Sequence, residues 1–300
     1  MKSRACFQVV VISLLIASVH AAAQTAATAR ATPWHVTWQP VRPVNGSVVL
    51  FRVTAPKAIS SLRGTWSDRE VSFRFDRASS SWYAMAGVGL NARAGTYPLR
   101  LEGLEGNGPG GDFTAEVPVY IKRYPTTALS VAPGFVEPPA EVQPRIEEEA
   151  ALKKQLFSEV SPEALWSGRF VAPVTTAVSG VFGSARTLNG VKKSQHQGLD
   201  YHAAVGTTVR ASNRGSVILA RGLYFEGNCV VIDHGDGLLT FYMHLSEIKV
   251  KEGEKVSNGQ ELGLTGESGR VTGPHLHFAV RWQGLYLDPQ TLIALNAPSL

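Results

Sequence analysis

The sequence predicts a mainly β protein, with two β-domains joined by a connector that contains one helix. Short apolar or alternating segments recur along most of the chain, and 29 glycines and 17 prolines in 300 residues supply frequent turns between them. An apolar fraction of 44% is typical of a folded protein and argues against disorder. Because 300 residues exceed what one core usually needs, we expect two domains.

Residues 1–23 have the pattern of a cleavable signal peptide. Lys2 and Arg4 precede an apolar run from Phe7 to Val19, and small residues follow at 21–23. This run is shorter than the roughly 20 residues of a membrane span. We therefore expect an exported protein of the periplasm or cell envelope, with no membrane span after cleavage. Loss of Lys2 and Arg4 lowers the formal charge from +5 to +3, too small an excess to indicate nucleic-acid binding.

Residues 33–123 are interpreted as a small immunoglobulin-like β-sandwich, although a small barrel is equally compatible with the pattern. The segment from Val71 to Phe75 alternates as one half-buried strand should. The run from Gly106 to Gly111 matches G-x-G-x-x-G, but a proline interrupts it and a strand follows, which favours a hairpin loop over a dinucleotide site. This domain could present the chain to glycan, dock a cell-wall protein partner or cover the cleft. Strands are expected at 47–53, 71–75, 82–88, 96–102 and 113–121.

Residues 124–170 are expected to form a connector. Its prolines indicate an extended start, and a helix from Arg145 to Val160 follows, with Glu149 and Lys153 as a favourable i,i+4 pair. We expect this helix to lie against one of the domains. Strand signals return in residues 171–300, at 209–219, 229–233, 239–244 and 275–282. After signal cleavage only Cys229 remains, which excludes an internal disulfide and a multi-cysteine metal cluster.

The histidines carry the main functional signal, because six of the eight lie between His196 and His277. Side chains two residues apart on a strand share one face, so His275 and His277 should stand side by side. Two such imidazoles need solvent, a partner or a metal. Asp200 follows His196 by four residues and can join the same site if the intervening chain curves around it.

Two neutral imidazoles and one carboxylate would form a three-ligand zinc set with a fourth position for water, as in catalytic zinc sites. Mg²⁺ or Ca²⁺ would require more carboxylates. Spacing alone leaves both metal binding and isolated surface histidines open. For His202 we expect a place at a groove edge or on the surface, and for His234 a structural hydrogen bond. Tyr224 and Asn228 are compatible with the cleft, the core or a turn.

Three motifs in this order resemble the signature of the M23 metallopeptidases, the LytM/lysostaphin-like family. The resemblance extends over about Phe170 to Pro289 and implies an antiparallel LytM-like β-sheet peptidase domain within residues 171–300. It includes Phe182, Gly183 and Arg186 before the motifs, and Asp288-Pro289 after them. The motifs are His196-x-Gly198-x-Asp200, Tyr242-Met243-His244-Leu245 and Gly273-Pro274-His275-Leu276-His277-Phe278.

The resemblance implies that His196, Asp200 and His277 bind one Zn²⁺ per chain. It further implies that His244 and His275 flank the bound water and the scissile carbonyl without binding metal. One of them would accept the water proton, and one would stabilise the oxyanion and protonate the leaving amine. The sequence does not decide which does which.

The implied activity is that of a zinc endopeptidase that hydrolyses peptide cross-links of bacterial peptidoglycan, in stem peptides or cross-bridges. The resemblance favours D-alanyl to diaminopimelate bonds, while glycine-rich bridges and a non-wall protein stay open.

Two other functions compete with a zinc peptidase. The segment Ser246 to Lys249 matches the S-x-x-K pattern of penicillin-binding proteins, but no K-T-G motif accompanies it. The main alternative is a catalytically inactive LytM-like scaffold that binds and activates a cell-wall amidase. Such domains typically lack part of the metal set, whereas all five positions here carry the expected residue types. We therefore expect an active enzyme.

Overall fold

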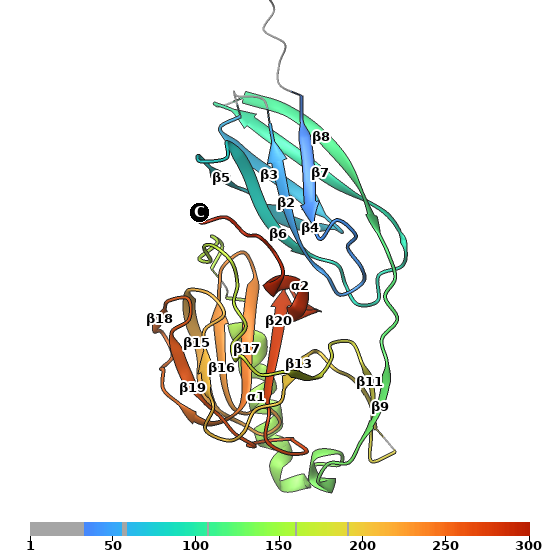
Figure 1. Cartoon of the computed structure of the whole chain (residues 1–300), viewed down its shortest axis with the longest axis vertical. Helices are drawn as coiled ribbons and strands as arrows, with labels where there is room; N and C mark the ends of the chain where they lie inside the picture. The colour runs from blue at the N-terminus through green and yellow to red at the C-terminus, as the bar shows by residue number, and fades with distance from the viewer. Residues whose placement is uncertain (1–32, 56–58, 107, 160, 191) are drawn as a thin grey trace, which may run out of the picture. The chain divides into compact units, whose positions relative to one another are not determined.

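The computed structural model describes residues 33–300 except 56–58, 107, 160 and 191 (Figure 1). The predicted signal peptide, residues 1–23, lies outside the described residues. Strands dominate the described chain, which confirms the predicted mainly β fold class. Among its helices none is long and apolar enough to cross a membrane.

Two four-stranded antiparallel sheets occupy residues 35–119, with the orders β1-β2-β6-β5 and β4-β3-β7-β8. Fully buried Phe51 of the first sheet meets fully buried Trp66 of the second edge-on, at 5.2 Å between ring centroids. This packing of two sheets is that of a sandwich. The strands are β1 His35–Gln39, β2 Val48–Thr54, β3 Ser61–Trp66, β4 Arg69–Ser72, β5 Arg74–Asp76, β6 Ser81–Gly87, β7 Gly95–Glu105 and β8 Gly108–Val119.

The prediction of one strand from Val71 to Phe75 is wrong. β4 ends at Ser72 in one sheet and β5 begins at Arg74 in the other, so the chain crosses between the sheets at Phe73. Alternating polarity is compatible with either path, because buried Val71 and Phe73 both reach the common core. The glycine-rich run does lie at the β7–β8 hairpin as predicted, although strand pairing already resumes at Gly108.

The connector contains more regular structure than expected. It forms the strand β9 Thr126–Leu129, the short 3-10 turns Pro133–Phe135 and Ala140–Val142, and the helix α1 Gln143–Leu156. The helix therefore begins two residues earlier and ends four residues earlier than predicted.

As expected, α1 lies against a domain, and its partner is the domain of residues 171–300. The amide of Tyr224 donates to Glu149 at 2.8 Å, and Lys153 Nζ lies 2.5 Å from Glu226 Oε1. The predicted Glu149–Lys153 pair is wrong, because Glu149 pairs with Arg145 at 2.7 Å while Lys153 pairs with Glu226. A local pair between Glu149 and Lys153 would contribute only about 0.3–0.5 kcal/mol, so the contact of Lys153 with Glu226 forms instead.

A ten-stranded antiparallel sheet forms most of the rest of the described chain, with the central order β10-β13-β20-β17-β16-β15-β18. β19 pairs with β14 and β17, and β21 pairs with β20. The predicted strand over 209–219 is wrong, because β14 ends at Arg210 and β15 begins at Gly215. The strands are β10 Val178–Gly180, β13 Gly198–Tyr201, β14 Thr208–Arg210, β15 Gly215–Leu223, β16 Gly227–Asp233, β17 Leu238–Ile248, β18 Lys255–Val256, β19 Glu261–Thr265, β20 Leu276–Trp282 and β21 Leu285–Leu287.

A smaller sheet lies beside the large one, in the order β12-β11-β9. The hairpin β11 Ala185–Leu188 and β12 Lys192–Gln195 is extended by the connector strand β9, which runs parallel to β11 (Figure 1). A short helix, α2 Pro289–Ile293, follows β21 and begins where the Asp288 side chain accepts from the Gln290 amide.

Candidate metal centre

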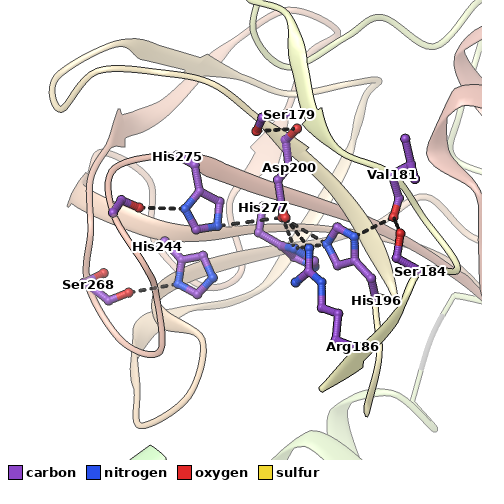
Figure 2. A network of polar contacts seen from close by, with 11 residues as sticks. Ser179, Val181, Ser184, Arg186, His196, Asp200, His244, Ser268, His275 and His277 are labelled. Atoms are coloured by element: carbon purple, nitrogen blue, oxygen red, sulfur yellow. Dashed lines mark hydrogen bonds and ion pairs between the residues drawn. The ribbon is translucent and has the colours of Figure 1, made fainter. Parts of the chain in front are cut away.

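Two neighbouring strands bring the three predicted ligands together. In the register of β13 and β20, Asp200 lies directly opposite His277, and His196 lies just before β13. Asp200 Oδ1 is 2.8 Å from His277 Nδ1 and 3.0 Å from His196 Nε2, and these two nitrogens are 3.1 Å apart (Figure 2). Three potential ligand atoms therefore converge on one point.

Two glycines make this convergence sterically possible. A Cβ on Gly198 would lie 2.7 Å from His277 Nε2 and 2.5 Å from the Phe278 carbonyl oxygen. A Cβ on Gly180 of β10 would overlap the Asp200 carboxylate. The glycine inside the H-x-G-x-D motif thus has a physical reason: β13 must approach β20 closely for Asp200 to reach His277.

The atoms of the cluster that face away from the common point have partners of their own. His196 Nδ1 lies 2.7 Å from the carbonyl oxygen of Val181. Because a carbonyl only accepts, Nδ1 carries the proton and Nε2 keeps a lone pair that faces the cluster. Arg186 Nη2 donates to Asp200 Oδ2 at 2.5 Å, which leaves Oδ1 directed at the two histidines.

The protonation states also suit a metal. Burial disfavours the Asp200 carboxylate, but the adjacent rings of His196 and His277 outweigh this effect and hold its pKa well below the usual range. Burial lowers the pKa of His277, so its imidazole is neutral at neutral pH. A carboxylate and neutral imidazoles are the forms that bind metal ions.

The donor set fits a tetrahedral zinc site. With zinc–ligand bonds of about 2.0–2.2 Å, tetrahedral ligand atoms lie roughly 3.3–3.5 Å apart. The three atoms here are 2.8–3.1 Å apart, so small side-chain movements would accommodate an ion. Within the described chain the group consists of His196, Asp200 and His277, which leaves a coordination position for water.

His244 and His275 form a second pair beside the cluster. Their ring centroids are 4.9 Å apart, and the His244 ring lies 6.0 Å from that of His277. His244 Nδ1 donates to the Ser268 carbonyl at 2.9 Å, and His275 Nδ1 to the Gly273 carbonyl at 2.8 Å (Figure 2). Both rings therefore keep a lone pair on Nε2. The Nε2 atom of His275 lies 3.7 Å from Asp200 Oδ1.

His244 owes its orientation to an irregularity of β17. Its φ of 66° lies in the left-handed region, which is uncommon for a residue other than glycine. The pairing of β16 with β17 shifts register between Asn228 and Val230, opposite this point. As a result Met243 and His244 both line the groove, whereas a regular strand would direct them to opposite faces. Burial, together with the nearby His277 and His275, lowers the pKa of His244 to about 3.

These side chains lie in a groove of about 810 Å³. The β11–β12 hairpin and residues of β9 such as Thr127 line it, and so does the 270–275 segment before β20. His202 is an exposed residue of the lining, which agrees with the groove-edge prediction. Tyr224 and Asn228 have structural bonds instead, to the carbonyls of Gly134 and Leu245.

The comparisons with known proteins locate the family match in this part of the chain. Residues 194–289 match the sequence model described as Peptidase family M23. This segment belongs to peptidase family M23. The M23 segment contains all five residues of the cluster and of the second pair, but not Arg186 or the connector strand.

Relatives with assigned names resemble the chain in the same region. Peptidoglycan DD-endopeptidase ShyA of Vibrio cholerae is 48% identical over 115 residues, which cover 38% of this chain and 26% of that protein. DD-carboxypeptidase/endopeptidase Mpg of Neisseria meningitidis is 42% identical over 105 residues, 35% of this chain and 24% of that protein. The match thus spans about a quarter of the length of these relatives.

A solved structure extends the likeness beyond the M23 segment. A crystal structure from Pseudomonas aeruginosa that bears the name peptidase M23 aligns with a TM-score of 0.64 and 28% identity, over 84% of this chain and 95% of that chain. The likeness in fold therefore includes most of the described residues.

The competing serine motif has a structural role. Ser246 Oγ donates to the Thr265 carbonyl at 2.8 Å, and Lys249 pairs with Glu261 at 2.7 Å. His234 is also structural, as predicted, because both ring nitrogens have partners inside the core.

The sequence does not predict the bond between Arg186 and Asp200. Arg186 precedes the His196 motif by ten residues, and no spacing rule connects it with Asp200.

Proposed function

We propose that this chain is a zinc endopeptidase of the cell envelope that hydrolyses peptide cross-links of bacterial peptidoglycan. One observation carries the proposal: His196, Asp200 and His277 direct three ligand atoms at one point of a groove, beside the Nε2 lone pairs of two further histidines. The names of ShyA and Mpg, a peptidoglycan DD-endopeptidase and a DD-carboxypeptidase/endopeptidase, support this substrate and favour a D,D-peptide bond.

Zinc held by His196, Asp200 and His277 would lower the pKa of water to about 7 and polarise the substrate carbonyl. The protein itself positions the groups that move protons. His244 and His275 both present Nε2 as an acceptor, because Nδ1 of each donates to a carbonyl. One of them would accept the water proton at Nε2. The resulting N–H would hydrogen-bond to the developing oxyanion, and its proton would then pass to the leaving amine.

The inactive scaffold is less well supported than the enzyme. A scaffold has no need for a low-pKa carboxylate fixed by Arg186, nor for a left-handed residue that turns His244 into the groove. Unfavourable backbone conformations persist where the surrounding structure enforces them, often at functional sites.

Digestion of purified sacculi by the chain that begins after residue 23 tests the proposal. With zinc we expect cross-linked muropeptide dimers to disappear, as measured by mass spectrometry. We expect a chelator to stop the reaction and added zinc to restore it. His277→Ala should be inactive, whereas His35→Ala, an exposed histidine of β1, is the matched control and should remain active. Persistence of the dimers with zinc-loaded protein, or their loss in the presence of chelator, would contradict the proposal.

A further inference from the structure

Arg270 is a cation of the groove for which the described residues provide no anionic partner. It lines the groove together with His244 and His275 and is half-buried. Among the described residues its guanidinium forms no salt bridge, whereas the other arginine of the groove, Arg186, is paired with Asp200. A half-buried, unpaired charge is costly, so its position calls for an explanation.

The position of Arg270 is fixed by its surroundings. Its guanidinium lies over the Phe225 ring at 4.8 Å from the centroid, and its amide donates to the Phe225 carbonyl at 2.9 Å. The preceding Gly269 has a φ of 75°, and a Cβ there would overlap the backbone of Gly227. The segment before β20 is thus held tightly against β16.

The same segment also orients the second histidine pair. The carbonyl of Ser268 accepts the hydrogen bond from His244 Nδ1, and its hydroxyl accepts from the Asn228 amide at 2.9 Å. Arg270 follows only two residues later. The segment therefore places a cation in the same groove as His244 and His275.

The charges around Arg270 leave it available. Burial lowers its pKa, Glu226 opposes this effect, and Arg186 adds to it. Glu226 is paired through Oε1 with Lys153 at 2.5 Å, and its Oε2 has no hydrogen-bond partner among the described residues, so it forms no hydrogen bond with Arg270. Arg186 is paired with Asp200. The guanidinium is still charged at neutral pH, because the ordinary pKa of arginine lies far above 7. Arg270 is therefore the cation with which an anion in the groove can pair.

We propose that Arg270 binds a carboxylate of the substrate peptide, so that the groove selects peptides with a free carboxylate near the scissile bond. The planar guanidinium donates two parallel hydrogen bonds to a carboxylate. Stem peptides carry several free carboxylates, so the proposed substrate can supply the anion. This inference rests on the proposed function and identifies the chemical group that the groove recognises.

A series of synthetic cross-linked stem peptides tests the inference. Each member has one of its carboxylates converted to a carboxamide, and kcat/KM is measured for the zinc-loaded protein. For one position we expect the carboxylate to be preferred by about ten- to a hundredfold, the range of charge-assisted hydrogen bonds. In Arg270→Gln this preference should fall to about one. Arg270→Lys should keep part of it, because the charge stays while the fork is lost.

The matched control is Arg221→Gln, at an exposed arginine of β15 that pairs with Glu252 outside the groove. This variant should keep the full preference, and thermal melting should show that all variants are folded. Equal cleavage of all peptides by the unmodified protein, or an unchanged preference in Arg270→Gln, would overturn the inference. Cleavage of none of the peptides by zinc-loaded protein would instead overturn the proposed function, and the inference with it.

Discussion

Two clusters at the large sheet differ in how their histidines are partnered. One is the His234 cluster, formed by His234, Thr240 and the Arg214 carbonyl, and the other is the candidate metal centre. His234 is fully buried, with Nδ1 2.7 Å from the Arg214 carbonyl and Nε2 2.8 Å from Thr240 Oγ1. Each of its ring nitrogens has its own partner. At the candidate metal centre, by contrast, the single oxygen Asp200 Oδ1 faces both His196 Nε2 and His277 Nδ1.

This difference separates a structural histidine from a ligand. Burial does not distinguish them, since His196 is only 3% exposed and His234 is 0% exposed. What distinguishes them is the number of electron pairs directed at one point. Both ring nitrogens of His234 have partners within the protein, whereas a carboxylate and two imidazoles directed at one point form a site that a cation would complete. The two clusters should therefore respond in opposite ways to substitution.

The largest effect is expected for Asp200→Ala, which removes the oxygen shared by both histidines. Zinc affinity should fall by more than the roughly 10- to 100-fold caused by loss of an outer partner of a ligand. Titration with zinc, followed by metal analysis after dialysis, measures this. If Asp200→Ala retained stoichiometric zinc as tightly as the unmodified chain, the two clusters would not differ in the way argued here.

The next effect is expected for His244→Asn, which tests the second histidine pair without removing a proposed ligand. Asparagine tolerates the left-handed conformation of this position. We expect zinc content to be unchanged and kcat to fall by about 10²–10⁴, the contribution of general acid–base catalysis. Muropeptide release under saturating zinc measures the rate. A simultaneous loss of zinc would mean that His244 belongs to the ligand group.

A smaller effect is expected for Arg186→Gln, which removes the partner of Asp200 Oδ2 but no ligand atom. Zinc affinity should fall by about 10- to 100-fold while activity at saturating zinc largely persists. Competition with a chelating dye measures the affinity. Arg221→Gln, at an exposed salt bridge, is the matched control and should leave the affinity unchanged. An unchanged affinity in Arg186→Gln would show that this arginine does not orient the carboxylate.

The sequence predicted the residues of the centre better than their supports. His275 and His277 follow from the two-residue period of a strand, and the order of the three motifs indicated His196, Asp200 and His244. The support from Arg186 depends on how the β11–β12 hairpin folds over the sheet, which no local pattern reveals. Likewise, β9 pairs with β11 across 59 residues of sequence, since Thr126 lies opposite Ala185.

The fold was predictable to a similar degree. Strand content follows from turns and alternation, but the choice of a two-sheet sandwich over a small barrel does not, because the pattern is compatible with both. The crossing at Phe73 was not predictable, because a residue that faces the shared core looks the same from either sheet. Nor was the failure of the Glu149–Lys153 pair, because Glu226 becomes a neighbour of Lys153 only after folding.

The last prediction concerns the His234 cluster. His234→Ala leaves the Arg214 carbonyl and Thr240 Oγ1 without their partner, so the free energy of unfolding at pH 7 should fall by about 1–3 kcal/mol, with the cavity adding to this loss. Urea unfolding of metal-free protein measures the change. Zinc binding per folded molecule should remain intact, in contrast to Asp200→Ala. A loss of zinc binding by folded His234→Ala would remove the distinction between the clusters.

The pH dependence sharpens this prediction. Burial lowers the pKa of His234 from 6.5 to about 4. Between about pH 4 and pH 6.5, this residue therefore binds a proton in the unfolded chain but not in the folded chain. The stability that depends on neutral His234 is therefore fully present above about pH 6.5 and is lost as the pH falls toward 4, by about 1.4 kcal/mol per pH unit at most. Because His234→Ala has no such group, the gap in stability between the two proteins should narrow on acidification. A gap that stayed constant from pH 7 to 4 would mean that His234 is not held neutral by its burial.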